Sequence, residues 1–232
     1  VVDRIYIGRI PGEATLAMGG LGLCLPLISI INAFANLFGM GGAPLCSIAR
    51  GRGDNEEAEK IMGNSFMLLI IFSVVLMVVG FIFKEDLLWL FGASANTIGY
   101  ANDYMTIYLL GTLFVLIGLG MNSFINSQGF AKIGMLTVLL GAVTNIILDP
   151  IFIFCFDLGV QGAAVATVIS QFVSALWTLQ FLTSKKTILK IKRSCLKLKY
   201  SYVTRIISLG MAGFMMAITN SIVSIVCNAT LQ

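Results

Sequence analysis

Long uncharged apolar stretches constrain this chain more than any other feature of its sequence. A helix needs roughly 20 apolar residues, at about 1.5 Å each, to cross a membrane. Five stretches without a charged side chain are this long, namely residues 14–49, 61–83, 104–131, 158–184 and 206–232. A sixth, residues 133–156, is apolar except for Asp149. Only 11% of the chain is charged, against about 25% in soluble domains. The sequence therefore predicts an all-α integral membrane protein.

The first apolar stretch is too long for one straight crossing and too short for two. We expect its crossing over about residues 16–40, followed by a break in the glycine-rich segment Gly39–Pro44. The opening sequence VVDRIYIGRI has the pattern of the end of an earlier span, and the last apolar run continues to the end of the sequence. We therefore expect both ends of the chain to cut through helices.

The distribution of Lys and Arg predicts the orientation, because these residues concentrate on the cytoplasmic side of a membrane. Twelve of the fifteen fall on one side of the predicted spans, and Arg4, Arg9 and Lys84 fall on the other. The loops at residues 50–60, 126–132 and 185–202 should therefore be cytoplasmic. We interpret the basic segment 185–202 as a solvated linker; a lipid-headgroup or regulatory site is the alternative.

The sequence offers little for enzymatic chemistry. It contains no His, which excludes Ser-His-Asp catalysis and His-ligated zinc. Its five Cys are scattered without a CxxC motif, so we interpret them as small apolar side chains. We predict that the protein is not an enzyme, needs no cofactor and binds no nucleic acid.

Asp149 is the candidate functional residue, because a carboxylate inside a membrane span is costly and usually marks an ion or substrate pathway. Asn145 lies one helical turn earlier, so its amide can bond the carboxylate. Pro150 follows directly and predicts a helix kink that leaves carbonyl oxygens free beside the acid. A purely structural role for Asp149, as a cap on a broken helix, is the alternative.

Two further residues should reach the same depth as Asp149. Asp3 lies near the outer end of the first, partial span, and Thr167 lies about 10 Å along the span that enters from outside. Two carboxylates in one dry pocket raise the pKa of at least one of them, which allows proton exchange near neutral pH. The same oxygens could instead bind Na⁺, with Asp149 and Asn145 as its ligands.

An ordered set of motifs resembles one transporter family. The segments are VVDRIYIGRI, IARGRGDNEEAEKIMGNS, LLWLFGAS, MNSFINSQGFAKIGM, NIILDPIFIF and GVQGAAVATVISQ. Together they are similar to the MepA-like bacterial branch of the multidrug and toxic compound extrusion (MATE) family. The resemblance implies a twelve-helix fold of two six-helix lobes arranged as an inverted V, located in the bacterial plasma (inner) membrane.

The resemblance also implies roles for particular residues. It places a cation- or proton-binding site at Asp3, Asn145, Asp149 and Thr167, and it marks Tyr104 and Asn122 as further cavity-lining positions. It divides the chain into an N-lobe (1–184), a cytoplasmic basic linker (185–202) and the start of the seventh helix (203–232). The segment SIVSIVCNATL resembles a second copy of the opening VVDRIYI, with Asn228 where Asp3 stands. We expect that the C-lobe is missing and that transport requires it.

The resemblance implies multidrug efflux by antiport of a drug against H⁺ or Na⁺, and we expect alternating access to the two sides of the membrane. The expected substrates are amphiphilic, cationic small molecules, and the expected environment is the lipid bilayer. A flippase for lipid-linked saccharides with a related fold is the nearest alternative, and it predicts basic residues inside the cleft. A non-transporting membrane scaffold is the second alternative, although it does not explain Asp149.

Overall fold

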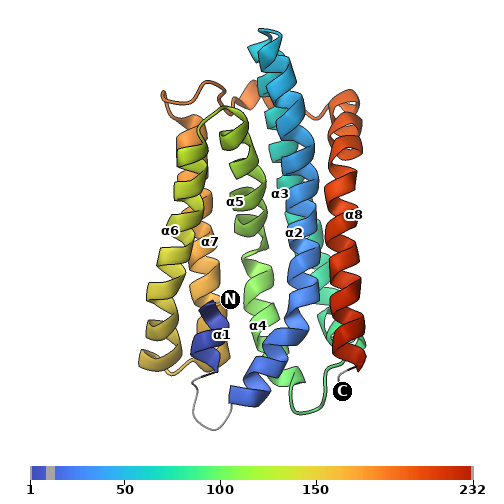
Figure 1. Cartoon of the computed structure of the whole chain (residues 1–232), viewed down its shortest axis with the longest axis vertical. Helices are drawn as coiled ribbons and strands as arrows, with labels where there is room; N and C mark the ends of the chain where they lie inside the picture. Colours follow the sequence, from blue (N-terminus) through green and yellow to red (C-terminus); the bar gives the residue numbers. More distant parts are fainter. Residues whose placement is uncertain (1, 9–13, 231–232) are drawn as a thin grey trace.

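The structure, a computed structural model, describes residues 2–8 and 14–230 and contains only helices and their connections over these ranges (Figure 1). The prediction of an all-α fold is therefore confirmed. In chain order the elements are α1 (Val2–Ile7), α2 (Ala14–Gly51), α3 (Asn55–Leu90), α4 (Ile98–Leu110), α5 (Thr112–Ser127), α6 (Ala131–Pro150), the π-helical turn η1 (Ile151–Cys155), α7 (Gly159–Thr183), the 3-10 turn η2 (Arg193–Cys195) and α8 (Tyr200–Thr230).

Five of the described helices are long and apolar enough to cross a membrane, and the bent pair α4–α5 makes a sixth. Their outward faces are apolar where a soluble protein would be polar. On α3, for example, Val74, Val78 and Ile82 follow one another at one-turn intervals with 49%, 48% and 65% of their surface exposed. Side chains of this kind have a favourable environment in lipid or against another apolar surface, and not in water. The structure therefore has the features of a multi-pass membrane protein.

The glycine-rich segment of α2 contradicts one prediction. We expected a break at Gly39–Pro44, yet α2 continues as one helix to Gly51. The glycines serve close packing instead. A Cβ on Gly41 would overlap the backbone oxygen of Ile206 in α8, and a Cβ on Gly39 would lie 2.7 Å from the backbone oxygen of Gly120 in α5. Small residues allow such close helix approach in membranes. Packing against α5 and α8 therefore stabilises the helical conformation of residues 39–44.

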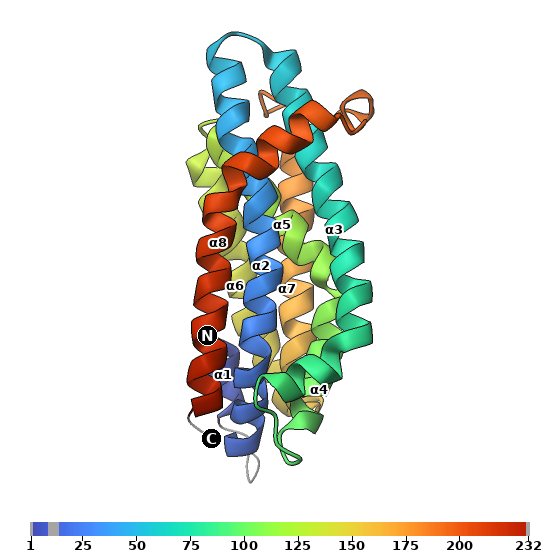
Figure 2. The same cartoon turned by 90° about the vertical axis from the view of Figure 1, so that its right-hand side faces the viewer.

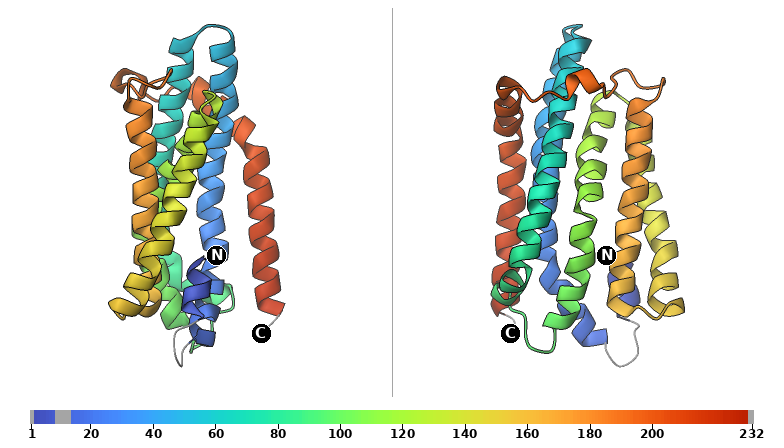
Figure 3. Two further views of the ribbon diagram at one scale, coloured as in Figure 1. Left: turned by 60° about the vertical axis from the view of Figure 1, so that its left-hand side comes forward. Right: turned by 180° about the vertical axis from the view of Figure 1, so that it is seen from behind.

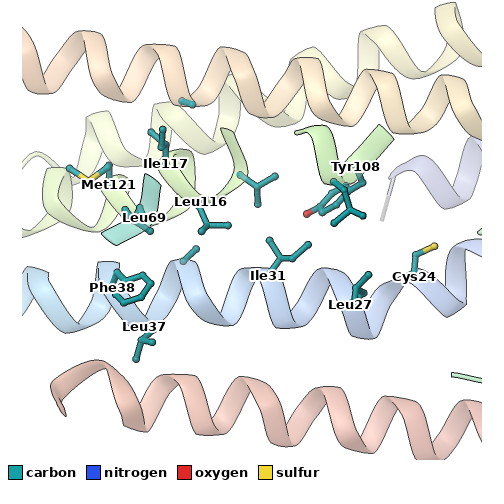
Figure 4. Packing of buried hydrophobic residues seen from close by; sticks show 14 of the residues in the cluster. Cys24, Leu27, Ile31, Leu37, Phe38, Leu69, Tyr108, Leu116, Ile117 and Met121 are labelled. Atoms are coloured by element: carbon teal, nitrogen blue, oxygen red, sulfur yellow. The ribbon is translucent and has the colours of Figure 1, made fainter. Parts of the chain in front are cut away.

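Helix α2 is the central helix of the bundle and contacts α3, α4, α5 and α8. Figure 4 shows Phe38 and Ile31 of α2 on the side of Leu69 of α3 and of Leu116 and Met121 of α5, whereas Leu37 points toward α8. Phe38 is fully buried against the ring of Phe72, with centroids 4.8 Å apart, and Leu69 and Met121 are also fully buried. Helix α8 packs beside α2 along the edge of the bundle (Figure 2).

The third apolar stretch, residues 104–131, does not form one straight helix. Helices α4 and α5 meet at Gly111 with a bend of 58°. No proline causes this bend. A Cβ on Gly111 would meet the side chain of Val168 on α7, so the glycine allows the bend to lie directly against α7. Both α4 and α5 therefore contact α7, on either side of the bend along the length of α7.

The basic linker between α7 and α8 lies against the cytoplasmic ends of other helices (Figure 3, right). Thr187 and Leu189 within it are 5% and 0% exposed. The interpretation of this segment as a solvated linker is therefore wrong for part of its length. The physical reason is that buried polar side chains of α3 and of the α5–α6 connection bond its backbone, as detailed below.

Candidate functional site

Helix α6 places a single carboxylate toward the interior of the protein. Only three of its residues are buried, namely Gly134, Thr137 and Asp149, while most of its other side chains are apolar and at least partly exposed. Asp149 is 0% exposed. Because transfer of a carboxylate out of water costs several kcal/mol unless it is neutralised or hydrogen-bonded, its position requires specific partners.

The side-chain amide of Asn145 is one of these partners. Its Nδ2 donates to Oδ1 of Asp149 at 3.1 Å and lies 3.4 Å from Oγ1 of Thr167 on α7. The spacing of four residues puts Asn145 and Asp149 on one helix face, and the glycine and alanines at residues 162–164 allow α7 to approach. The structure thus brings Asn145, Asp149 and Thr167 together from two helices.

The helix changes its hydrogen-bonding pattern directly after Asp149. Pro150 is the last α-helical residue, and the chain continues as the π-helical turn η1. Proline has no N–H to donate to the carbonyl one turn earlier, and π-turns of this kind are frequent at functional sites. A Cβ on Gly162 would lie 2.6 Å from the backbone oxygen of Phe152, so η1 packs tightly against the start of α7.

Helix α1 lies beside this cluster and contacts α6, α7 and α2. The ring of Tyr6 meets that of Phe154 edge to face, with centroids 6.4 Å apart. Asp3 belongs to α1, but its side chain lies outside the residues that the structure describes. The side chain of Asn228 in α8 lies outside them as well.

A cavity of about 410 Å³ opens between α2, α4, α5, α6 and α7. Asn145 and Thr167 line it, and so do Tyr104 and Asn122, whereas Asp149 does not. Tyr104 and Tyr108 stack along α4 with ring centroids 6.1 Å apart. The cavity therefore has aromatic surface on α4 and neutral hydrogen-bonding groups in its lining. On the side of α6 and α7 it borders the cluster of Asn145, Asp149 and Thr167.

Several polar cavity residues were not found from the sequence. They are Asn32 on α2, Tyr108 on α4, Thr137 on α6, and Ser170, Gln171 and Ser174 on α7. The side-chain carbonyl oxygens of Asn32 and Asn122 are buried and have no hydrogen-bond partner among the described residues, although both residues line the cavity. Asn32 could have been found, because an amide in the middle of an apolar span is costly and therefore informative.

None of the described residues that line the cavity is a Lys, Arg, Asp or Glu. Nowhere in the described part of the chain do three or more His, Cys, Asp or Glu side chains cluster closely enough to hold a metal ion. A divalent-metal centre built from such ligands is therefore not present in the described part. Asp149 supplies one negative charge to the described cluster, and the oxygens of Asp149, Asn145 and Thr167 are groups that can hold a proton or a monovalent cation.

Comparison with known proteins agrees with this architecture. Residues 1–151 match the family model MatE. The multidrug export proteins MepA of Staphylococcus saprophyticus and Staphylococcus haemolyticus are 29% and 28% identical over 228 residues, which are 98% of this chain and 50% of each relative. The chain thus spans about half the length of the curated relatives it matches.

Solved structures lead to the same family. The MATE multidrug transporter DinF-BH, solved as a complex, superposes with a TM-score of 0.93 at 33% identity, over 99% of this chain and 51% of that one. An inward-facing multidrug resistance MATE family transporter superposes with a TM-score of 0.91 at 26% identity, over 97% of this chain and 50% of that one. The sequence-based resemblance is confirmed, and the chain belongs to the MATE family of multidrug efflux transporters.

Proposed function

We propose that this chain forms the ion-coupled lobe of a transporter that exports amphiphilic, cationic small molecules in exchange for H⁺ or Na⁺. The observation that carries the proposal is the complete burial of Asp149 on a helix whose other side chains are mostly apolar and at least partly exposed. A carboxylate in this environment is stabilised by proton or cation binding. Ion binding at Asp149 can therefore release a substantial free energy to the transport cycle.

The ion-binding step involves Asp149, Asn145 and Thr167. A proton would bind a carboxylate oxygen of Asp149, whereas Na⁺ would contact that carboxylate together with the side-chain oxygens of Asn145 and Thr167. Asp3 is proposed as a second carboxylate, because α1 packs against α6 and α7. Binding of either ion neutralises the charge and changes how Asn145 bonds across α6 and α7.

The cavity supports the proposed substrate class. Its apolar wall and the stacked rings of Tyr104 and Tyr108 suit flat aromatic molecules, and aromatic faces attract cations. Asn32, Asn122 and Gln171 also line the cavity, and their neutral amide groups suit hydrogen bonds with a polar group of the drug. A volume of about 410 Å³ suits a drug-sized ligand.

Ion and drug would be coupled through alternating access of two lobes, this one and a second lobe that transport requires. Thr167 and Asn145 belong both to the ion cluster and to the cavity wall. An ion that repositions them changes the wall that a drug contacts. By thermodynamic linkage the effect is reciprocal, so drug binding must weaken ion binding by the same factor.

The decisive experiment measures drug efflux by the complete two-lobe protein in proteoliposomes under an imposed pH gradient or an imposed Na⁺ gradient. Asp149→Asn keeps the shape of the side chain and removes its charge, so we expect efflux to fall to background under both gradients. The gradient that drives the wild-type protein identifies the coupling ion. Retained efflux in Asp149→Asn would remove this residue from the mechanism.

Asp157→Asn is the matched control. Asp157 is exposed at the end of the same hairpin and has a positive φ of 53°, a conformation that Asn adopts readily. The same substitution there should leave efflux unchanged. Equal loss of efflux in both variants would point to a general effect on folding instead of a specific ion site.

The flippase alternative receives no support from the cavity. A site for lipid-linked saccharides with phosphate groups requires cationic side chains, and the described cavity lining has none. The same proteoliposomes test this alternative directly, since a flippase would translocate a fluorescent lipid-linked saccharide independently of the drug.

A further inference from the structure

The linker between α7 and α8 is held at its first half by one buried amide. The Oε1 atom of Gln128, a residue that is only 3% exposed, accepts three hydrogen bonds from the linker. They come from the Thr187 hydroxyl at 2.7 Å, the Ile188 N–H at 3.1 Å and the Leu189 N–H at 2.9 Å. Removal of such an acceptor would leave buried donors unsatisfied, so this segment is fixed to the lobe.

Helix α3 fixes the second half of the linker. Glu59 accepts a hydrogen bond from the Lys190 N–H at 3.2 Å and forms an ion pair with the Lys192 ammonium. This bond to Glu59 raises the pKa of Lys192. Asn64, which is 1% exposed, accepts from the Lys199 N–H at 2.8 Å and lies 3.3 Å from the Lys197 carbonyl oxygen. The linker therefore has one defined path across the end of the bundle.

This path leaves most of the linker's positive charge unpaired. The sequence contains no Asp or Glu after Asp157. Glu59 pairs with Lys192, and Glu57 pairs with Arg205 at 3.3 Å. Within the described part of the chain, five linker lysines have no carboxylate partner, namely Lys185, Lys186, Lys190, Lys197 and Lys199. A set of unpaired cations on a backbone of fixed path attracts anions.

Apolar side chains stand exposed among these lysines. Ile188 and Leu198 are 47% and 45% exposed, and Tyr200 at the start of α8 is 85% exposed. The segment connects the ends of two helices that are long and apolar enough to cross a membrane (Figure 3, right), so we expect these side chains near the boundary between lipid and water. Lysine and tyrosine side chains beside aliphatic ones are typical of a surface that contacts lipid headgroups.

We propose that residues 184–200 form a binding surface for anionic phospholipid headgroups on the cytoplasmic leaflet. The lysines would contact the lipid phosphates, and Ile188, Leu198 and Tyr200 would contact the upper part of the acyl region. The positive-inside distribution of charge alone requires neither the fixed path of the linker nor its exposed apolar side chains. Gln128, Glu59 and Asn64 provide the fixed path.

Native mass spectrometry of the purified chain in a neutral detergent tests this proposal. Phosphatidylglycerol or phosphatidylcholine with identical acyl chains is added at equal concentration, and the bound lipids are counted. We expect the wild-type chain to retain phosphatidylglycerol several-fold more than phosphatidylcholine. Lys197→Gln/Lys199→Gln and Lys185→Gln/Lys186→Gln should each reduce this preference at least twofold, while glycerol phosphate in solution should not compete.

The double variant Arg52→Gln/Lys132→Gln is the matched control, because it removes two exposed cations from the same side of the protein but outside the linker. Its lipid preference should equal that of the wild-type chain. Absence of a preference in the wild-type chain would overturn the proposal. An equal loss in the control would do so too, by indicating dependence on net charge, and full competition by glycerol phosphate would indicate a site for free phosphate groups.

Discussion

Helices α2 and α6 have nearly the same mean hydropathy but opposite positions in the protein. Among the 18 most apolar consecutive residues of each span, 44% are buried in α2, whereas 11% are buried in the span formed by α6 and η1. Helix α2 packs on five neighbouring helices (α1, α3, α4, α5 and α8), whereas α6 turns one polar face inward and leaves most of its apolar side chains at least partly exposed. Hydropathy therefore predicts that both helices cross the membrane, and the small and polar residues decide what each one does there.

This difference has a physical basis in lipid. Acyl chains are as apolar as leucine side chains, so no hydrophobic effect drives apolar residues to the interior of a bundle. Close packing and polar contacts select the inward face instead. In α2 this face is defined by Gly39, Gly41 and Phe38, and in α6 by Asn145 and Asp149. The first set holds helices together and the second set forms the candidate ion site.

The largest difference between the two helices should appear when an aliphatic side chain is removed. Ile31 on α2 is 2% exposed and Leu139 on α6 is 52% exposed. We expect Ile31→Ala to cost about 2–5 kcal/mol of unfolding free energy, because a cavity remains, and Leu139→Ala to cost about 0.5 kcal/mol or less. Equilibrium unfolding in mixed micelles measures both, and equal costs would contradict the assignment of α6 to the lipid-facing side.

A smaller contrast should appear between two glycines within α2. A Cβ on Gly41 would overlap the backbone of α8, while a Cβ on Gly22 would meet nothing within 4 Å. Gly41→Ala should therefore destabilise the chain by about 1–3 kcal/mol through overpacking. Gly22→Ala should stabilise it by about 0.5–1 kcal/mol, because alanine favours the helical conformation.

Thermal unfolding of the purified chain in detergent measures both glycine substitutions. The opposite signs are the essential result. If Gly41→Ala were neutral, the close approach of α2 and α8 at Ile206 and Gly210 would not contribute to stability. The glycine-rich segment would then need another explanation.

The smallest effect is expected at the hydroxyl of Thr167. Thr167→Val removes one hydrogen-bonding oxygen beside Asn145 and keeps the shape of the side chain. A hydrogen bond contributes about 0.5–1.5 kcal/mol, so the ion concentration for half-maximal efflux should rise about two- to tenfold. Assays of the complete protein at varied H⁺ or Na⁺ concentration give this value.

Thr178→Val is the control for the hydroxyl substitution. Thr178 is 0% exposed on the same helix α7 and does not line the cavity. Its hydroxyl has no hydrogen-bond partner among the described residues, so valine there should leave the ion dependence unchanged. A shift of equal size in both variants would mean that Thr167 acts through the packing of α7.

Much of the fold could be predicted from the sequence, because charge-free runs mark membrane helices directly. The errors have local causes. The segment Gly39–Pro44 has the composition of a loop, but its glycines serve helix contacts with α5 and α8 that a single sequence does not reveal. The contacts of Gln128 with the linker were also not predicted from the sequence, because they join residues about 60 positions apart.

The candidate site could be predicted in part, because helix spacing fixes which nearby residues share a face. Asn145 and Asp149 are one turn apart, so helix geometry alone predicts their contact, and the distance between them agrees. The contact of Thr167 with Asn145 followed from comparing depths in two helices. Asn32 and Gln171 reach the cavity from helices whose rotation depends on packing, and hydropathy carries no information about that rotation.

The π-helical turn at Ile151–Cys155 also changes how the end of this hairpin must be counted. Such a turn holds one more residue than an α-helical turn over the same length. By Cys155, the end of the turn, the side-chain direction therefore lags by about 100°, one α-helical residue, behind the face that Asn145 and Asp149 define. Pairwise alignments and chimeras that join this segment to an unbroken helix will point its outer residues in the wrong direction unless they skip one position.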